Sequence, residues 1–185
     1  MIKIKDTEYS VDFSFLVFNA LIFLVRDSAV IMTFYAVCLI HELGHVMAVY
    51  ATGGKIKSVI FSCTGVIITP EKNFKGELLV ILSGVTANIL TYIFCLITGK
   101  NELFAMLNLG TAIYNLLPYR QLDGGTAIAI LTDGTACERS VNILLTIVKI
   151  IFSVFLLFVS VVCGKEFFPI FLASVMLFVS ERGIK

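Results

Sequence analysis

Long apolar runs alternate with short polar segments along this chain. The runs lie at Val11–Val25, Ala29–Ala51, Glu77–Thr98, Leu103–Leu117, Val141–Val162 and Phe167–Ser180. A helix needs roughly 20 mostly apolar residues to cross the hydrocarbon core of a bilayer, and several of these runs approach or exceed that length. The pattern predicts an all-α multi-span membrane protein with about six transmembrane helices.

Shorter segments between the runs have the pattern of strands. Ile56–Phe61 and Gly65–Thr69 are rich in β-branched residues and only a few residues apart, which predicts a β-hairpin. Near the N-terminus, Ile2–Lys5 alternates apolar and charged residues and suits an edge strand. We therefore expect a small β-hairpin or sheet beside the helices.

Composition agrees with a membrane protein of one domain. The chain has 185 residues, of which 58% are hydrophobic, and its mean hydropathy is +0.98. A soluble domain averages roughly 45–50% apolar residues. The net charge of +1 is close to neutral and does not indicate a nucleic-acid partner. Five cysteines without a Cys-x-x-Cys pair give no sign of a disulfide framework.

The distribution of Lys and Arg predicts the orientation of the helices. With six spans and a cytosolic N-terminus, most cationic residues fall on the cytosolic side, as the positive-inside rule requires. These residues are Lys3, Lys5, Lys55, Lys57, Lys72, Lys75, Arg120, Arg139, Arg182 and Lys185. Both termini and the hairpin would then be cytosolic. Lys149 lies inside a predicted span, where a functional role and snorkelling to the surface are both open.

One apolar run carries a recognisable metal-binding pattern, His41-Glu42-Leu43-Gly44-His45. Residues four apart share one face of a helix, so His41 and His45 can direct two imidazoles at one ion. Glu42 lies beside them in the position of a general base, as in zinc hydrolases. Polar groups at this depth are costly, and a bound metal gives a reason for them.

A third ligand has to be Asp, Glu or Cys, because the chain contains only two histidines. Asp123 is the best candidate. Pro118 ends the preceding helix, and Gly124-Gly125 gives the backbone freedom to fold back toward the histidines. An ordinary turn aspartate before glycine is the alternative.

These residues resemble the site-2 protease family of intramembrane zinc metalloproteases. The matching motifs are His41-Glu42-Leu43-Gly44-His45, Ser83-Gly84-Val85-Thr86-Ala87-Asn88, Asn115-x-x-Pro118 and Leu122-Asp123-Gly124. The chain looks most like the compact bacterial group that includes the sporulation protease acting on a sigma-factor precursor. It departs from the family at Val85, where proline is usual, and from the compact group at Gln121, where proline is frequent.

The resemblance implies the roles of individual residues. His41, His45 and Asp123 would bind one Zn²⁺ per chain, and Glu42 would be the catalytic glutamate. No other cofactor is expected. Asn88 and Asn115 match family positions linked to the active-site region, as groups that could assist substrate or oxyanion binding. For Asn88 an interhelical hydrogen bond is the alternative, and for Asn115 a simple capping role.

The implied function is hydrolysis of a peptide bond in or near a transmembrane segment of a membrane protein, as in regulated intramembrane proteolysis. The partners would be that substrate and the lipid bilayer, with a regulatory membrane partner left open. Residues 1–185 would form a single membrane-embedded core without a PDZ or CBS domain, in a bacterial cytoplasmic membrane. The alternatives are a membrane metal transporter and a catalytically inactive relative that binds membrane helices.

Overall fold

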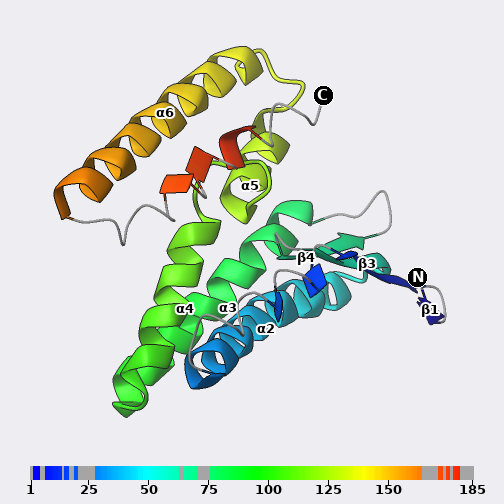
Figure 1. Ribbon diagram of the computed structural model, residues 1–185. Coiled ribbons are helices and arrows are strands. Elements are labelled where there is room, and N and C mark those ends of the chain that lie inside the picture. The colour runs from blue at the N-terminus through cyan, green and yellow to red at the C-terminus, as the bar shows by residue number, and fades with distance from the viewer. Residues whose placement is uncertain are drawn as a thin grey trace. The chain divides into compact units, whose positions relative to one another are not determined.

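The structure is a computed structural model, and it describes residues 2–4, 7–13, 15–16, 19–20, 28–62, 65–70, 76–163, 171–172, 174–175 and 177–179. The chain forms two compact units, residues 1–114 and 115–185. The strands are β1 (Ile2–Ile4), β2 (Thr7–Val11), β3 (Ile56–Ser62) and β4 (Gly65–Pro70). The helices are α2 (Ser28–Ala51), α3 (Glu77–Thr98), α4 (Glu102–Asn115), α5 (Asp123–Thr132) and α6 (Glu138–Cys163) (Figure 1).

Three of these helices are long and apolar enough to cross a bilayer: α2, α3 and α6. At 1.5 Å per residue, α2 is about 36 Å long, more than the roughly 30 Å of the hydrocarbon core. Large apolar side chains such as Met47 of α2 and Val161 of α6 are exposed, which suits contact with lipid. The chain is therefore a membrane protein.

The prediction of about six spans is met only in part. The helix α4 has 14 residues, short for a full crossing. About half of each of the predicted runs Val11–Val25 and Phe167–Ser180 lies outside the described residues, and Val11 itself ends β2. The described parts of the chain thus contain three candidate spans, and the larger number stays a prediction.

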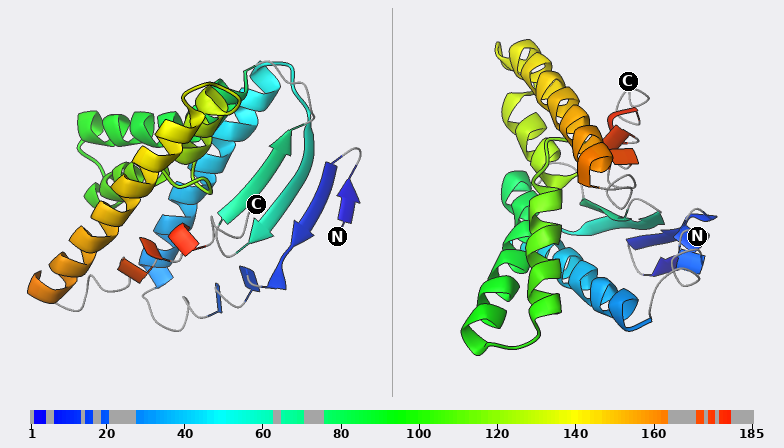
Figure 2. Two further views of the ribbon diagram at one scale, coloured as in Figure 1. Left: turned by 90° about the horizontal axis from the view of Figure 1, so that it is seen from above. Right: turned by 60° about the vertical axis from the view of Figure 1, so that its left-hand side comes forward.

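A four-stranded sheet in the order β1-β2-β3-β4 belongs to the first unit (Figure 2, left). The predicted hairpin is confirmed, because β3 and β4 pair antiparallel with Ile60 opposite Ile67. The strand β2 is an addition that the sequence pattern did not predict. It pairs parallel with β3, with Tyr9 opposite Val59, while β1 pairs antiparallel with β2.

The sheet packs against the C-terminal part of α2 and the start of α3. Ala48 and Val49 of α2, Val80 of α3, and Ile56 and Val59 of β3 form one buried apolar cluster. Burial of apolar surface contributes about 25 cal/mol per Å², so this cluster fixes the sheet to the two helices. It also fixes the backbone at Val80, whose carbonyl oxygen contacts Nδ1 of His45.

The loop after α4 differs from the expected one at both ends. The helix ends at Asn115 rather than Leu117, because Pro118 disfavours helical backbone in the residue before it. The next helix begins at Asp123 rather than after Gly125. Both glycines are buried, and a Cβ at Gly125 would overlap the carbonyl of Tyr119. Close packing of this helix start on its own loop therefore outweighs the poor helix propensity of glycine.

Buried polar side chains hold the second unit together. Tyr119 Oη lies 2.8 Å from Ser174 Oγ, which lies 2.9 Å from Ser153 Oγ of α6. Lys149 of α6 is only 5% exposed, and its Nζ lies 5.5 Å from the centroid of the Tyr119 ring. Lys149 is therefore buried against an aromatic ring, a cation–π arrangement, rather than extended to the surface.

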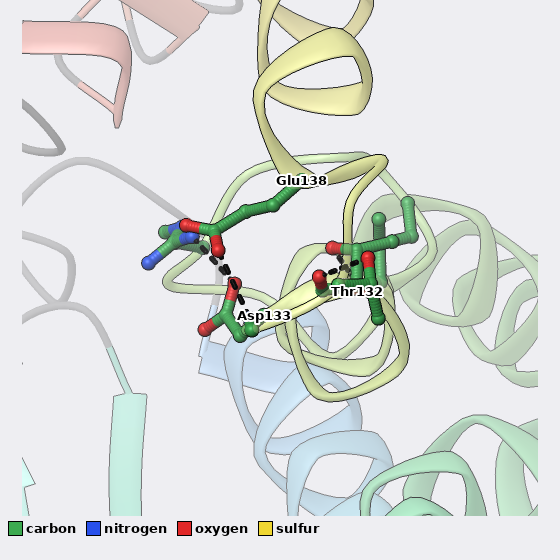
Figure 3. A network of polar contacts seen from close by, with 7 residues as sticks. Thr132, Asp133 and Glu138 are labelled. Carbon is green, nitrogen blue, oxygen red and sulfur yellow. Dashed lines mark hydrogen bonds and ion pairs between the residues drawn. The ribbon is translucent and has the colours of Figure 1, made fainter.

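The turn between α5 and α6 is ordered by short polar contacts (Figure 3). The Gly134 N–H donates to Glu138 Oε2 at 2.9 Å. Thr135 Oγ1 donates to the Thr132 carbonyl at 2.6 Å. Arg120 and Asp133 form an ion pair of 3.1 Å that is about half exposed. Exposed pairs of this kind contribute about 0.2–1 kcal/mol, so the Arg120–Asp133 pair adds little to stability.

Candidate metal centre

The helix α2 brings the two histidines together. One helical turn separates His41 from His45, and their Nε2 atoms lie 3.2 Å apart. The ring centroids are 4.8 Å apart, and the ring planes are nearly perpendicular at 84°. His41 is buried and His45 is half-buried. The spacing of four residues therefore produces the pair of converging imidazoles that the sequence predicted.

The outer nitrogen of each ring contacts a carbonyl oxygen of α3. His41 Nδ1 lies 2.8 Å from Asn88 Oδ1, and His45 Nδ1 lies 2.8 Å from the Val80 carbonyl oxygen. Both oxygens only accept hydrogen bonds, so each Nδ1 carries the hydrogen. In a neutral imidazole, Nε2 is then the nitrogen that has the lone pair.

This arrangement fits a metal ion. Two Nε2 lone pairs point toward each other at 3.2 Å, where neither nitrogen of a neutral pair has a hydrogen to donate. A cation between them removes that repulsion. Metal-binding histidines commonly donate the other ring N–H to a carbonyl or carboxylate, which fixes the ring and its tautomer. The backbone of Val80 and the amide of Asn88 fill those positions here.

Gly84 of α3 provides the space for both rings. A Cβ at this position would lie 2.7 Å from His45 Cε1 and 2.8 Å from His41 Cε1, closer than carbon atoms approach. On the facing helix, a Cβ at Gly44 would lie 2.7 Å from the Ser83 carbonyl oxygen. The two glycines thus let α2 and α3 approach closely at the level of the histidines.

Glu42 follows His41 on α2 and is half-buried. It lies about 100° around the helix from His41, so it borders the imidazole pair without belonging to the same row of side chains. This is the position that the sequence motif predicts for a proton-accepting group.

Two other predicted residues belong to the second unit. Asp123 is the first residue of α5 and half-buried, and a negative charge at a helix N-terminus is favourable. Asn115 is the last residue of α4 and also half-buried. Imidazole and carboxylate groups are both ligands of zinc, so Asp123 has a side chain of a suitable type. A role for Asn115 in binding substrate stays a prediction.

Sequence reasoning missed two contributors to this centre. One is the Val80 carbonyl, because a backbone group has no signal in the sequence. The other is Asn108 of α4, which is fully buried and accepts a hydrogen bond from Asn88 Nδ2 at 2.9 Å. A signal for Asn108 did exist, since an amide inside an apolar run is a functional suspect.

Comparison with known proteins gives one informative result. No protein-family profile and no curated protein matches the chain. Among solved structures, the chain is similar to the site-2 protease from Methanocaldococcus jannaschii, with a TM-score of 0.66 and 22% sequence identity. The similarity covers 99% of this chain and 93% of that one. The resemblance predicted from the sequence motifs is therefore confirmed at the level of the fold, which is that of a site-2 protease.

Proposed function

We propose that this chain is an intramembrane metalloprotease that hydrolyses a peptide bond in or near a transmembrane segment of a substrate protein. The observation that carries the proposal is the His41–His45 pair on an apolar helix. Their Nε2 atoms lie 3.2 Å apart, and both Nδ1 atoms contact carbonyl oxygens. Glu42 lies next to this pair, and the fold is similar to that of a site-2 protease.

Asp123 is proposed as the third ligand of one zinc ion per chain. A catalytic zinc usually takes three protein ligands and keeps one position open, and the chain has no third histidine to fill the remaining place. Imidazole and carboxylate donors suit zinc. When bound, such an ion activates a water molecule and polarises a carbonyl oxygen.

In the proposed reaction Glu42 carries the proton. Its carboxylate takes one hydrogen from the attacking water as the new C–O bond forms at the scissile carbonyl. It then gives this hydrogen to the amide nitrogen as the C–N bond breaks. His41 and His45 are held in position by Asn88 and the Val80 carbonyl.

The strand β4 is proposed as the place where the substrate backbone binds. A membrane helix has to unwind before its peptide bonds can be attacked, and its backbone groups then need partners that lipid cannot supply. Within the described sheet β4 is an edge strand. An unwound substrate segment can therefore add to it as a further strand. The proposed location is a bacterial cytoplasmic membrane, with both termini cytosolic.

Metal removal tests the proposal. The protein, purified and placed in sealed vesicles with a panel of single-span membrane proteins, is expected to release fragments cut within or near the span. A chelator should abolish these fragments, and added zinc should restore them. Mass spectrometry of the products and metal analysis are the measurements. Zinc flux into the vesicles without any product would instead indicate a transporter.

The substitution Asp123→Asn tests the third ligand. Loss of the negative charge is expected to weaken zinc binding by about 100-fold or more, because an amide is a poor ligand for zinc compared with a carboxylate. Competition with a chelator measures the affinity.

Asp133→Asn is the matched control, because Asp133 directly follows the same helix and is half exposed. It should change zinc affinity less than twofold. Equal affinity of the Asp123→Asn variant and the unmodified protein would exclude Asp123 as a ligand.

A further inference from the structure

A chain of buried amides connects α4 to the metal centre within the first unit. Asn108 Nδ2 donates to the Phe104 carbonyl at 2.8 Å. Asn88 Nδ2 donates to Asn108 Oδ1 at 2.9 Å, and Asn88 Oδ1 lies 2.8 Å from His41 Nδ1. Asn88 and Asn108 are both 0% exposed. Buried amides in a membrane protein are costly unless fully hydrogen-bonded, so this arrangement calls for a function.

The direction of each hydrogen bond follows from the Phe104 carbonyl, where this row of hydrogen-bonded amides ends. The Phe104 carbonyl only accepts, so the nitrogen of the Asn108 amide has to face it and the oxygen has to face Asn88. Asn88 then presents its nitrogen to Asn108 and its oxygen to His41. This oxygen requires a hydrogen on His41 Nδ1, which leaves His41 Nε2 without one.

We propose that Asn108 is a positioning residue for the metal centre, which acts through Asn88 to keep the hydrogen of His41 on Nδ1 and so leave Nε2 able to bind metal. The proposal builds on the assignment of His41 as a ligand in the proposed function. Asn108 itself touches neither the metal position nor the substrate in this assignment.

Asn88 alone holds its orientation weakly. Its remaining hydrogen bond runs from Nδ2 to the Val37 carbonyl at 3.4 Å, longer than the usual 2.7–3.2 Å. If the amide turned over, its nitrogen would face His41 Nδ1, and the hydrogen of the imidazole would move to Nε2. A protonated Nε2 has no lone pair for a metal ion. Asn108 therefore provides the contact that prevents this rotation.

His45 provides a control within the same molecule. Its Nδ1 contacts the backbone carbonyl of Val80, which cannot exchange donor for acceptor by rotation. The tautomer of His45 should therefore be insensitive to any change at Asn108. Since the chain contains only two histidines, their ring nitrogens can be observed separately.

The test is nitrogen NMR of metal-free protein labelled with ¹⁵N-histidine, above the usual histidine pKa of about 6.5. In unmodified protein we expect the hydrogen of both rings on Nδ1. In Asn108→Leu we expect a new population of His41 with hydrogen on Nε2, unchanged His45 signals, and zinc affinity lowered by about tenfold or more. A His45→Gln variant assigns the His41 signals. Asn142→Leu, an amide change on α6, should alter neither signal nor affinity.

Two results would overturn the proposal. One is hydrogen on Nε2 of His41 in the unmodified protein, and the other is an unchanged His41 tautomer in folded Asn108→Leu. If that variant does not fold, Asn108→Asp is the alternative, because it keeps an oxygen toward Asn88. We expect this variant to retain the hydrogen on Nδ1 of His41. Loss of that hydrogen from Nδ1 in Asn108→Asp would also overturn the proposal. Failure of the unmodified protein to bind zinc would instead refute the proposed function, because the tautomer is measured without metal.

Discussion

Replacement of Glu42 by Gln is expected to abolish peptide-bond cleavage while one metal ion stays bound per chain. The proposed ligands are His41, His45 and Asp123, so the amide removes none of them. Glutamine keeps the size of the side chain but can no longer take a proton from water and pass it on. General-base catalysis typically contributes 10²–10⁴-fold. We therefore expect the cleavage rate to fall by about 1,000-fold or more.

The measurement pairs two readings on the same preparation, metal content per chain and rate of product formation. Glu77→Gln is the matched control, because Glu77 lies exposed in the first turn of α3 and should affect neither reading. A Glu42→Gln variant that cut at the unmodified rate would show that Glu42 is not the base. A variant that lost its metal as well would show that Glu42 acts as a ligand.

The membrane helices could be predicted closely from the apolar pattern alone. The predicted run Glu77–Thr98 coincides with α3, and Ala29–Ala51 differs from α2 by one residue. These ends are marked locally, since Gly99 adopts a left-handed conformation after α3, a common way for a helix to end. The ends of a long apolar run are visible in the local sequence, so these two helices could be located without tertiary information.

The strand β2 was beyond such reasoning. Thr7, Tyr9 and Val11 alternate with the polar Glu8 and Ser10, but the segment is only five residues long. Its parallel partner β3 lies more than 40 residues away with α2 in between. Only the assembled fold decides that pairing. Val11 was accordingly placed at the start of an apolar run, although it lies opposite Phe61 in the sheet.

The candidate site also has features that the local sequence predicts and features that depend on tertiary contacts. The His41–His45 pair follows from a spacing of four residues on one helix, a purely local property. The role of Gly84 and the link from Asn108 to Asn88 depend on how α2, α3 and α4 contact one another. The motif identified Asp123 as a candidate ligand. Its position at the start of a helix was not predicted, because the two glycines that follow it are typical of a loop.

The substitution Gly84→Ala is expected to weaken metal binding and, with it, cleavage, whereas Glu42→Gln keeps its metal. The added methyl group would overlap His45 and come within 2.8 Å of His41 Cε1. Neither ring can move aside easily, because each is held by a hydrogen bond of 2.8 Å through its Nδ1. Forcing one methyl group into a packed interior costs about 1–3 kcal/mol. Since 1.4 kcal/mol is a factor of ten in an equilibrium constant, we expect zinc affinity to fall by about 5- to 150-fold.

Gly110→Ala is the matched control, since a Cβ at Gly110 of α4 would meet no atom within 4 Å. Alanine is the better helix former by about 0.5–1 kcal/mol, so this variant should keep its metal and be at least as heat-stable as the unmodified protein. Thermal unfolding in detergent and metal analysis compare the two variants. If Gly84→Ala kept one zinc at unmodified affinity, the two rings could not lie over Gly84, and the pairing of α2 with α3 at the metal centre would be wrong.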